Sequence, residues 1–341
     1  MGFMIRTWLS LVALIFAAPL SAQEGPDDGV NADMILALKG LQLLDQRLNA
    51  IGYRLVDANA PYCDRKSART GLLLNDVVQY VDQETARFAL GFDGAIGITA
   101  VAPDSPAETA KLSPGDTLLA INTMPLDDIA VDDPELSNEQ PVYRRVAAIN
   151  KLLEQALAEG NVQLTISQGG ISRTIPVGHV MTCSGQFQIR VSADRSASAD
   201  GKLVSVSSRL AEYFLNDDEF AAVVAHELAH NLLKHRDRLD AQGVNRGFFG
   251  QFGKSASEIK AAEIEADRLS VWLMSNAGYD PQAAIRFWTR YGKEHGKGIF
   301  SASTHYRWKK RVELFEEELA KMAAMPAVDG KFAPPLLIKA D

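Results

Sequence analysis

Apolar residues recur at helical spacing close to the start of the chain. Between residues 31 and 50 they fall three or four positions apart, which predicts an amphipathic helix whose apolar face packs on a domain. Residues 53–56, which begin with an aromatic residue and end with a β-branched one, are interpreted as a short strand. The apolar positions of the predicted helix are Met34, Ile35, Leu38, Leu41, Leu44 and Leu48.

From about residue 67 to residue 180 the pattern changes to short strands separated by turns. Ser105 can cap a short helix that has Pro106 at its first position. This segment is therefore expected to form a small domain rich in β-structure. Its predicted strands are residues 96–101, residues 117–122 and the two arms of a hairpin at 162–177 that turns at Gly169-Gly170, and its longer helix is 143–157.

Beyond residue 186 two strands, 186–191 and 202–207, precede two long helices. Asn216 can cap the first helix, with Glu219 completing a capping box, and this helix is expected to run to about His235. The second helix is predicted to begin at the capping box of Ser255 and Glu258 and to end at Gly278. The fold class is therefore α+β.

The first residues have the pattern of a secretory signal peptide. Arg6 precedes an apolar stretch at residues 8–18, and Ala22 is followed by a polar segment, so cleavage is expected after Ala22 and export to the periplasm follows. An uncleaved membrane anchor is the alternative, although the apolar stretch is short for a transmembrane helix. No second membrane span is expected.

Composition limits the possible partners and the redox compartment. The 341 residues carry a net charge of −8, which argues against nucleic acid as a partner because phosphate binding needs clustered lysine and arginine. A chain of this length suggests two domains. Cys63 and Cys183 are the two cysteines, and in an exported protein they most simply form one disulfide that ties the ends of the β-rich segment. Two buried free thiols are the alternative.

The strongest chemical signal is the stretch with His226, Glu227 and His230. Two histidines four residues apart on a helix project from one face, and a chain with only six histidines matches this pattern by chance seldom. His-Glu-x-x-His is the pattern of a zinc hydrolase helix, in which two imidazoles bind the metal and the carboxylate activates water. The alternative is an amphipathic helix with two solvated histidines.

A catalytic zinc site typically has a third protein ligand. Glu263 and Asp267 are four residues apart and share a face of the second long helix, while Glu265 points elsewhere. Glu263 is the candidate ligand, and Asp267 is placed to accept a ring N–H from a ligating histidine. On spacing alone, a solvated acidic helix surface explains these residues equally well.

These motifs together resemble the M48 family of zinc metallopeptidases. The resemblance covers about residues 195–315 and implies a gluzincin fold, endopeptidase activity on polypeptides, one zinc ion per chain and Glu263 as the third ligand. The matching features are the His226–His230 motif, the Glu263 and Asp267 pair, the stretch from Asn276 to Pro281, the Asp200-Gly201 turn and the Thr304-His305 pair.

The chemistry that this resemblance implies assigns roles to three more residues and to one strand. Glu227 would take a proton from the attacking water and return it to the leaving amine. His305, supported by Arg311, would stabilise the developing oxyanion. Where the family usually has proline after this histidine, the chain has Tyr306, so the local turn differs. The strand at 202–207 is expected to pair with an extended substrate.

The β-rich segment resembles a PDZ domain of the bacterial, protease-associated type. Ser105-Pro106-Ala107, Gly115-Asp116 and a strand ending at Asn122 carry the resemblance. It implies that an extended peptide adds as a strand beside the longer helix, with its C-terminal carboxylate held by the loop of Leu90, Gly91 and Phe92. Lys111 departs from the usual glycine, and Asp93 disfavours a carboxylate, so a structural or autoregulatory module is the alternative.

The sequence therefore predicts an exported zinc metalloendopeptidase that acts on misfolded or specific envelope proteins, with a PDZ domain that recruits substrate or regulates activity. The alternative is a PDZ-based adaptor or chaperone whose peptidase domain is rarely active.

The glycine- and phenylalanine-containing loop 243–253 is either a lid or a loop tucked against the body. The expected segments are a signal peptide (1–22), a helix and linker (23–66), a PDZ-like β-barrel or sandwich (67–183), a mainly helical zincin domain with a small sheet (184–325) and a tail (326–341).

Overall fold

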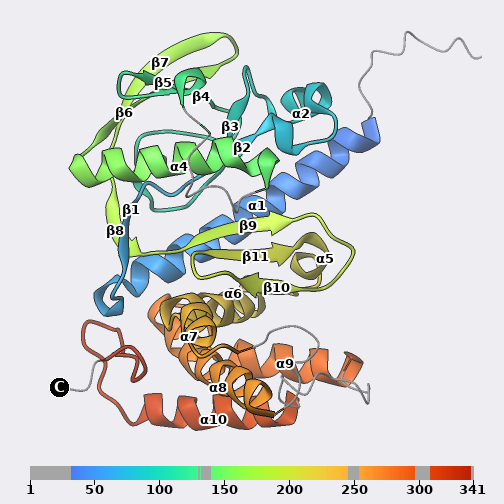
Figure 1. Cartoon of the computed structure of the whole chain (residues 1–341), viewed down its shortest axis with the longest axis vertical. Helices are drawn as coiled ribbons and strands as arrows, with labels where there is room; N and C mark the ends of the chain where they lie inside the picture. Colours follow the sequence, from blue (N-terminus) through green and yellow to red (C-terminus); the bar gives the residue numbers. More distant parts are fainter. Residues whose placement is uncertain (1–31, 130, 132–139, 245–252, 296–307, 339–341) are drawn as a thin grey trace, which may run out of the picture.

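The computed structural model describes residues 32–129, 131, 140–244, 253–295 and 308–338. A long helix, α1 (Ala32–Ala58), runs between a strand-rich lobe and a helical lobe (Figure 1). The predicted α+β class is confirmed, although the larger sheet is open, and the described strands form no closed barrel.

The strand-rich lobe, residues 60–183, is built on an antiparallel sheet with the order β2-β3-β4-β6-β7, in which β5 pairs with β4. A separate pair, β1 and β8, joins the start of this lobe to its end. Its elements are η1 (Ala60–Tyr62), β1 (Lys66–Arg69), β2 (Leu72–Asp76), η2 (Val77–Gln79), α2 (Gln83–Leu90), β3 (Ile96–Val101), α3 (Pro106–Thr109), β4 (Thr117–Ile121), β5 (Met124–Pro125), η3 (Leu126–Asp128), α4 (Pro141–Glu159), β6 (Val162–Gln168), β7 (Ile171–Val177) and β8 (Val180–Cys183).

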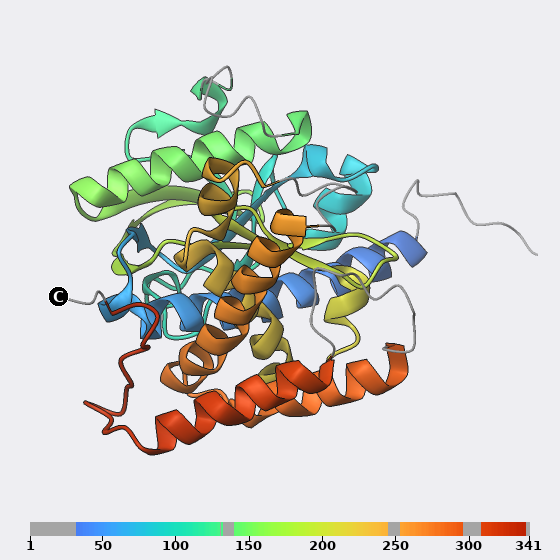
Figure 2. The same ribbon diagram turned by 60° about the horizontal axis from the view of Figure 1, so that its bottom comes forward.

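The helical lobe, residues 184–338, has a three-stranded sheet with the order β10-β11-β9 above its helices. Helix α10 lies alongside α9 (Figure 2). Helix α10 also packs with α8, and α9 packs with α6. Its elements are β9 (Gln186–Arg190), β10 (Ala197–Ala199), β11 (Leu203–Ser207), α5 (Ser208–Ala211), α6 (Asp217–Leu232), α7 (His235–Ala241), α8 (Gly253–Asn276), α9 (Gln282–His295) and α10 (Trp308–Ala323).

Helix α1 continues through residues 53–56, so the predicted strand there is wrong. Leu48, Ile51 and Leu55 keep helical spacing and are buried in the main core of the helical lobe. Gly52 permits this packing because a Cβ at that position would lie 2.3 Å from the ring of Phe187. The tertiary contact outweighs the strand preference of the local residues.

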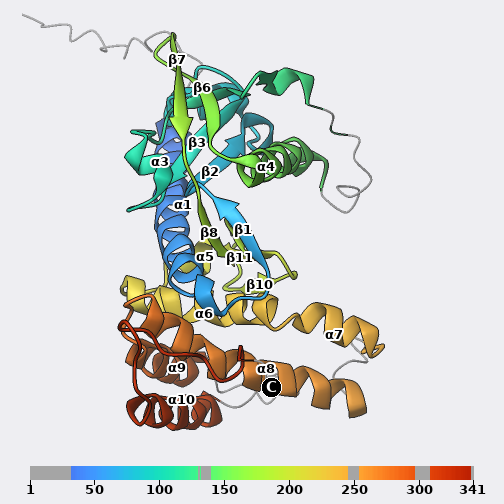
Figure 3. The ribbon, with the colours of Figure 1, turned by 90° about the vertical axis from the view of Figure 1, so that its left-hand side faces the viewer.

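The first half of α1 packs on the strand-rich lobe, where Leu38 contacts α2. One helix thus contributes to cores in both lobes. Figure 3 shows β1 and β8 side by side in the connection between the lobes. Cys63 and Cys183 form a disulfide at this connection, with their Cα atoms 5.5 Å apart.

Two further expectations for the helical lobe are wrong. The motif helix ends at Leu232, and Lys234 adopts a left-handed conformation with φ 54° before α7 begins at His235. The strand β11, predicted to pair with substrate, is the central strand of its sheet and is hydrogen-bonded to β9 on one side and β10 on the other. Both edges of β11 are therefore already paired, and it cannot accept a substrate strand.

Within the part of the chain that the structure describes, no helix is both long enough and apolar enough to span a membrane.

Candidate active site

Helices α6 and α8 bring three potential metal ligands together. Glu263 Oε2 lies 3.5 Å from His226 Nε2, and Glu263 Oε1 lies 3.4 Å from His230 Nε2. The two Nε2 atoms are 3.2 Å apart, and all three ligand atoms fall within 4.8 Å of one another. Two imidazole nitrogens and one carboxylate oxygen form a donor set that zinc prefers in catalytic sites, so these residues fit the predicted ion.

The local sequence explains why helix α6, and with it the two histidines, is held in a fixed position. Asn216 caps the helix by accepting the Glu219 N–H at 3.0 Å, and the carboxylate of Glu219 accepts the Leu215 N–H and an ion pair from Arg290. Between the cap and the motif the helix is apolar and buried, with the small sheet and α8 packed around it. Its position leaves the histidines little freedom to move.

Asp267 and Arg311 support the first histidine. Asp267 Oδ1 lies 2.9 Å from His226 Nδ1, and the fully buried carboxylate also accepts two hydrogen bonds from Arg311, one of them at 2.8 Å from Nε. Since the carboxylate only accepts, Nδ1 of His226 carries a hydrogen, and Nε2, which faces Glu263, is the ring nitrogen left to bind a metal ion. The Arg311 guanidinium stacks over Trp288 at 3.6 Å from the ring centroid.

A second chain of contacts leads away from the other histidine, and the sequence did not predict it. His230 Nδ1 lies 2.8 Å from His235 Nδ1, and His235 Nε2 lies 3.0 Å from Glu265 Oε2. Glu265 also accepts a hydrogen bond from Arg238 at 2.8 Å. The available signal was a third histidine five residues after the motif, but a continuous helix would have turned it away.

The charges around the ligands shift their pKa values in opposite directions. Burial and the Arg311 guanidinium favour neutral His226, but Asp267 and Glu263 outweigh both and raise its pKa to about 9. Burial, together with the charge on His226, lowers the pKa of His230 to about 3. Burial would raise the pKa of Asp267, but the charge of Arg311 and the hydrogen bond from His226 hold it below its usual range.

Of the other predicted catalytic residues, the structure describes Glu227 and Arg311 but not His305. Glu227 follows His226 on α6 and is partly exposed. Arg311 binds Asp267, a contact that differs from the predicted support of an oxyanion. His305 lies outside the described residues, as do the signal peptide and residues 245–252 of the candidate lid.

The predicted peptide-binding loop does not line the cleft that lies beside β2. Leu90 and Phe92 are buried against Val77, and Gly91 is the left-handed cap of α2. This cleft, of about 460 Å³, lies between β2 and α4, with β9 and the 200–205 segment on its other side. The segment Thr70-Gly71-Leu72 lines it at the start of β2.

Arg69 also lines this cleft, next to Glu154. Burial lowers the pKa of the Arg69 guanidinium, and the charge of Glu154 partly offsets this effect. A partly desolvated cation in a cleft beside a strand edge favours an anionic group on an extended ligand.

Comparisons with known proteins agree with this geometry. Residues 186–261 match the family model described as Peptidase family M48, and residues 97–142 match the model described as PDZ domain. Three curated relatives carry the name mitochondrial metalloendopeptidase OMA1. The Schizosaccharomyces pombe protein is 34% identical over 124 residues, which are 30% of this chain and 37% of the relative.

The Arabidopsis thaliana relative is 28% identical over 138 residues, or 34% of this chain and 27% of the relative. The Saccharomyces cerevisiae relative is 26% identical over 166 residues, or 40% of this chain and 48% of the relative. The chain therefore spans between about a quarter and a half of the length of these relatives. The predicted resemblance of the two lobes to an M48 peptidase and a PDZ domain is confirmed.

Proposed function

We propose that this chain, whose residues 186–261 match the model described as Peptidase family M48, is a zinc-dependent endopeptidase that cuts polypeptides. The observation that carries the proposal is the convergence of His226 and His230 from α6 with Glu263 from α8. Their ligand atoms lie within 4.8 Å of one another, and α6 also carries Glu227. A structural zinc site would normally have four protein ligands, whereas three ligands and a neighbouring carboxylate suit catalysis.

The residues around the site would each have a separate role in peptide hydrolysis. A zinc ion bound there would polarise the scissile carbonyl and acidify the attacking water. Glu227 would accept the proton of this water and deliver it to the leaving amine. Asp267 holds the ring of His226 with Nε2 towards Glu263. We retain His305 as the proposed donor to the oxyanion, and Arg311 acts through Asp267 instead.

The short strand β10 is the better candidate for binding the substrate backbone. Among the described strands it pairs with β11 alone, so its other edge is available, and it contacts the motif helix α6. An extended chain added to this edge would be held by backbone hydrogen bonds along the metal centre. Such binding tolerates many sequences, which supports our proposal that misfolded envelope proteins are substrates.

We propose that the cleft between β2 and α4 receives the C-terminal segment of a polypeptide. Among the strands that the structure describes, β2 pairs with β3 alone, so its other edge can accept an added strand. Arg69 supplies a cation for the terminal carboxylate. Export to the periplasm is part of the proposal; the apolar stretch at residues 8–18 and the disulfide between Cys63 and Cys183 support it.

The proposal is tested by bound zinc and by cleavage of unfolded casein, comparing the wild type with Glu227→Gln. Glu227→Gln should retain zinc and lose at least about a hundredfold in turnover, because general base catalysis typically contributes that much. The matched control is Glu317→Gln on the exposed face of α10, which should cut as the wild type does. Equal cleavage by Glu227→Gln and the wild type contradicts the mechanism.

The alternative, an adaptor or chaperone that binds chains and rarely cuts them, makes a different prediction. Wild type would then hold unfolded casein and suppress its aggregation without producing fragments, and Glu227→Gln would do so equally well.

A further inference from the structure

We infer that His235 and Glu265 are positioning residues for the metal centre, which fix the ring of His230 so that its Nε2 lone pair faces Glu263. This inference rests on the metal site of the proposed function, and it does not depend on which polypeptide is cut. His235 is buried, and the three side chains form a continuous chain from α8 through α7 to α6. We call it the His235 relay.

The hydrogen positions in the relay follow from what each group can donate. The Glu265 carboxylate accepts only, so His235 Nε2, 3.0 Å away, carries a hydrogen. The neutral His235 ring then has its lone pair on Nδ1, which lies 2.8 Å from His230 Nδ1. His230 must therefore donate from Nδ1.

A neutral histidine that donates from Nδ1 has its lone pair on Nε2, which lies 3.4 Å from the Glu263 carboxylate. The opposite tautomer of His235 would turn a hydrogen away from Glu265 and leave its carboxylate without that partner. It would also force the His230 hydrogen onto Nε2, in the position that the metal needs. The relay thus selects the tautomer that can bind a cation.

The break between α6 and α7 makes this relay possible. In an unbroken helix, residues five apart are turned about 140° from each other and cannot meet. Here the chain leaves the helix after Leu232, and Lys234 takes a left-handed conformation with φ 54°. That conformation costs a residue other than glycine about 1 kcal/mol or more. It brings His235 back against His230, at a position that sequence periodicity alone assigns to the opposite face.

The two ligating histidines are therefore supported by two carboxylates of the same helix. Asp267 reaches His226 directly, at 2.9 Å. Glu265 lies two residues earlier on α8, on another face, and contacts His230 only through the ring of His235. Arg238 holds Glu265 from the other side at 2.8 Å. Each metal-binding ring is fixed by its own partner, so the two supports can be tested separately.

The test compares zinc affinity, measured by competition with a chromophoric chelator, among three variants and the wild type. In His235→Asn, the amide oxygen can replace ring Nδ1 as the acceptor for His230, so zinc affinity should stay within about threefold of the wild type. His235→Leu removes this acceptor. Glu265→Leu removes the carboxylate that keeps the hydrogen on Nε2 of His235, so the ring can adopt either tautomer. Each should weaken zinc binding by about 10- to 100-fold, the range typical of partners behind metal ligands.

Cobalt substitution gives a readout that is independent of turnover. The visible absorption of bound Co²⁺ reports ligand geometry, and it should change in His235→Leu while staying close to the wild type in His235→Asn and in the control Glu317→Gln. Full zinc affinity and an unchanged cobalt spectrum in folded His235→Leu would overturn the inference. If His235→Leu does not fold, Glu265→Leu decides: wild-type zinc affinity there refutes the relay.

The relay and the proposed function fail in different ways. A relay error appears as unchanged zinc affinity in the leucine variants, whatever the peptidase activity. An error in the proposed function appears as cleavage that survives Glu227→Gln, whatever the zinc affinities of the relay variants.

Discussion

The buried pair of Asp267 and Arg311 gives a prediction that separates two roles for Arg311. Asp267 is fully buried, and the Arg311 side chain is 7% exposed. Arg311→Met keeps an apolar side chain against Trp288 but removes the partner of a buried carboxylate. Breaking a buried ion pair from one side costs about 3–5 kcal/mol. For a domain of about 150–250 residues this corresponds to a fall of roughly 6–20 °C in the unfolding temperature.

The assay is thermal unfolding of the metal-free protein, extended to a double-mutant cycle with Asp267→Asn. Because the double variant buries neither charge, it should recover much of the stability that Arg311→Met loses. A coupling free energy of at least about 1 kcal/mol is expected for groups in direct contact. The neighbouring control, Lys310→Met, changes an exposed residue and should alter stability by less than about 0.5 kcal/mol.

The refuting result is specific. If Arg311→Met unfolds at the wild-type temperature and binds zinc normally, but cuts casein slowly, then Arg311 acts on the reacting substrate. That is the role first predicted for it beside His305, and the interpretation built on Asp267 would be wrong.

Two further predictions concern the rest of the chain. Asp45 is buried in α1 with its Oδ1 3.4 Å from the Ile189 N–H, and burial, only partly offset by this hydrogen bond, raises its pKa from 3.8 to about 7. The folded state therefore holds this proton more tightly than the unfolded chain does. The free energy of unfolding is highest below pH 4 and falls as the pH rises to 7, because the buried carboxyl must then lose its proton. Asp45→Asn should raise the unfolding free energy at pH 8 by up to about 4 kcal/mol and change it little at pH 4; an equal gain at both pH values would contradict this. In the cleft beside β2, Arg69→Gln should weaken binding of peptides with a free C-terminal carboxylate severalfold, measured by fluorescence anisotropy, and leave binding of the amidated peptides unchanged. Equal losses for both peptides would show that Arg69 does not contact the carboxylate.

Local spacing made part of the site predictable. His226 and His230 share a helix face whatever the fold, because four residues make slightly more than one turn. Glu263 is different. Its spacing from Asp267 was equally consistent with a solvated surface, and only the resemblance to a family singled it out. The structure adds the distances, 3.4 and 3.5 Å to the two histidines.

The errors have a common physical cause, which is that tertiary packing overrides local preference. Residues 53–56 have side chains suited to a strand, yet burial against both the small sheet and α6 keeps them helical. No glycine, proline or asparagine stands at Lys234 to signal the break after α6. β10 has only three residues, too few for an alternating pattern to appear, so the sequence pointed to its neighbour β11 as the substrate strand.

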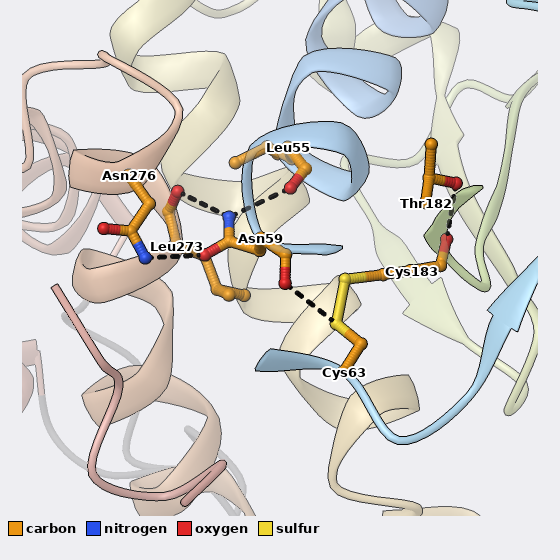
Figure 4. The surroundings of a disulfide bond; sticks show 7 residues. All are labelled: Leu55, Asn59, Cys63, Thr182, Cys183, Leu273 and Asn276. Atoms are coloured by element: carbon orange, nitrogen blue, oxygen red, sulfur yellow. Dashed lines mark hydrogen bonds between the residues drawn. A yellow bond between two sulfur atoms is a disulfide. The ribbon is translucent and has the colours of Figure 1, made fainter. Parts of the chain in front are cut away.

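The same α8 helix that carries the carboxylates is also fixed to the joint between the lobes. Asn59, fully buried at the end of α1, donates to Leu273 O at 3.1 Å and accepts from Asn276 at 2.9 Å (Figure 4). The chain then reaches Cys63 and its disulfide to Cys183. A change in the angle between α1 and α8 would break these two hydrogen bonds. It would leave the buried side-chain oxygen of Asn59 without its donor, at a cost of about 1–3 kcal/mol. The strand-rich lobe is tied by this joint to the helix that holds Glu263, Glu265 and Asp267, so tilting α1 against α8 would disturb the metal centre as well.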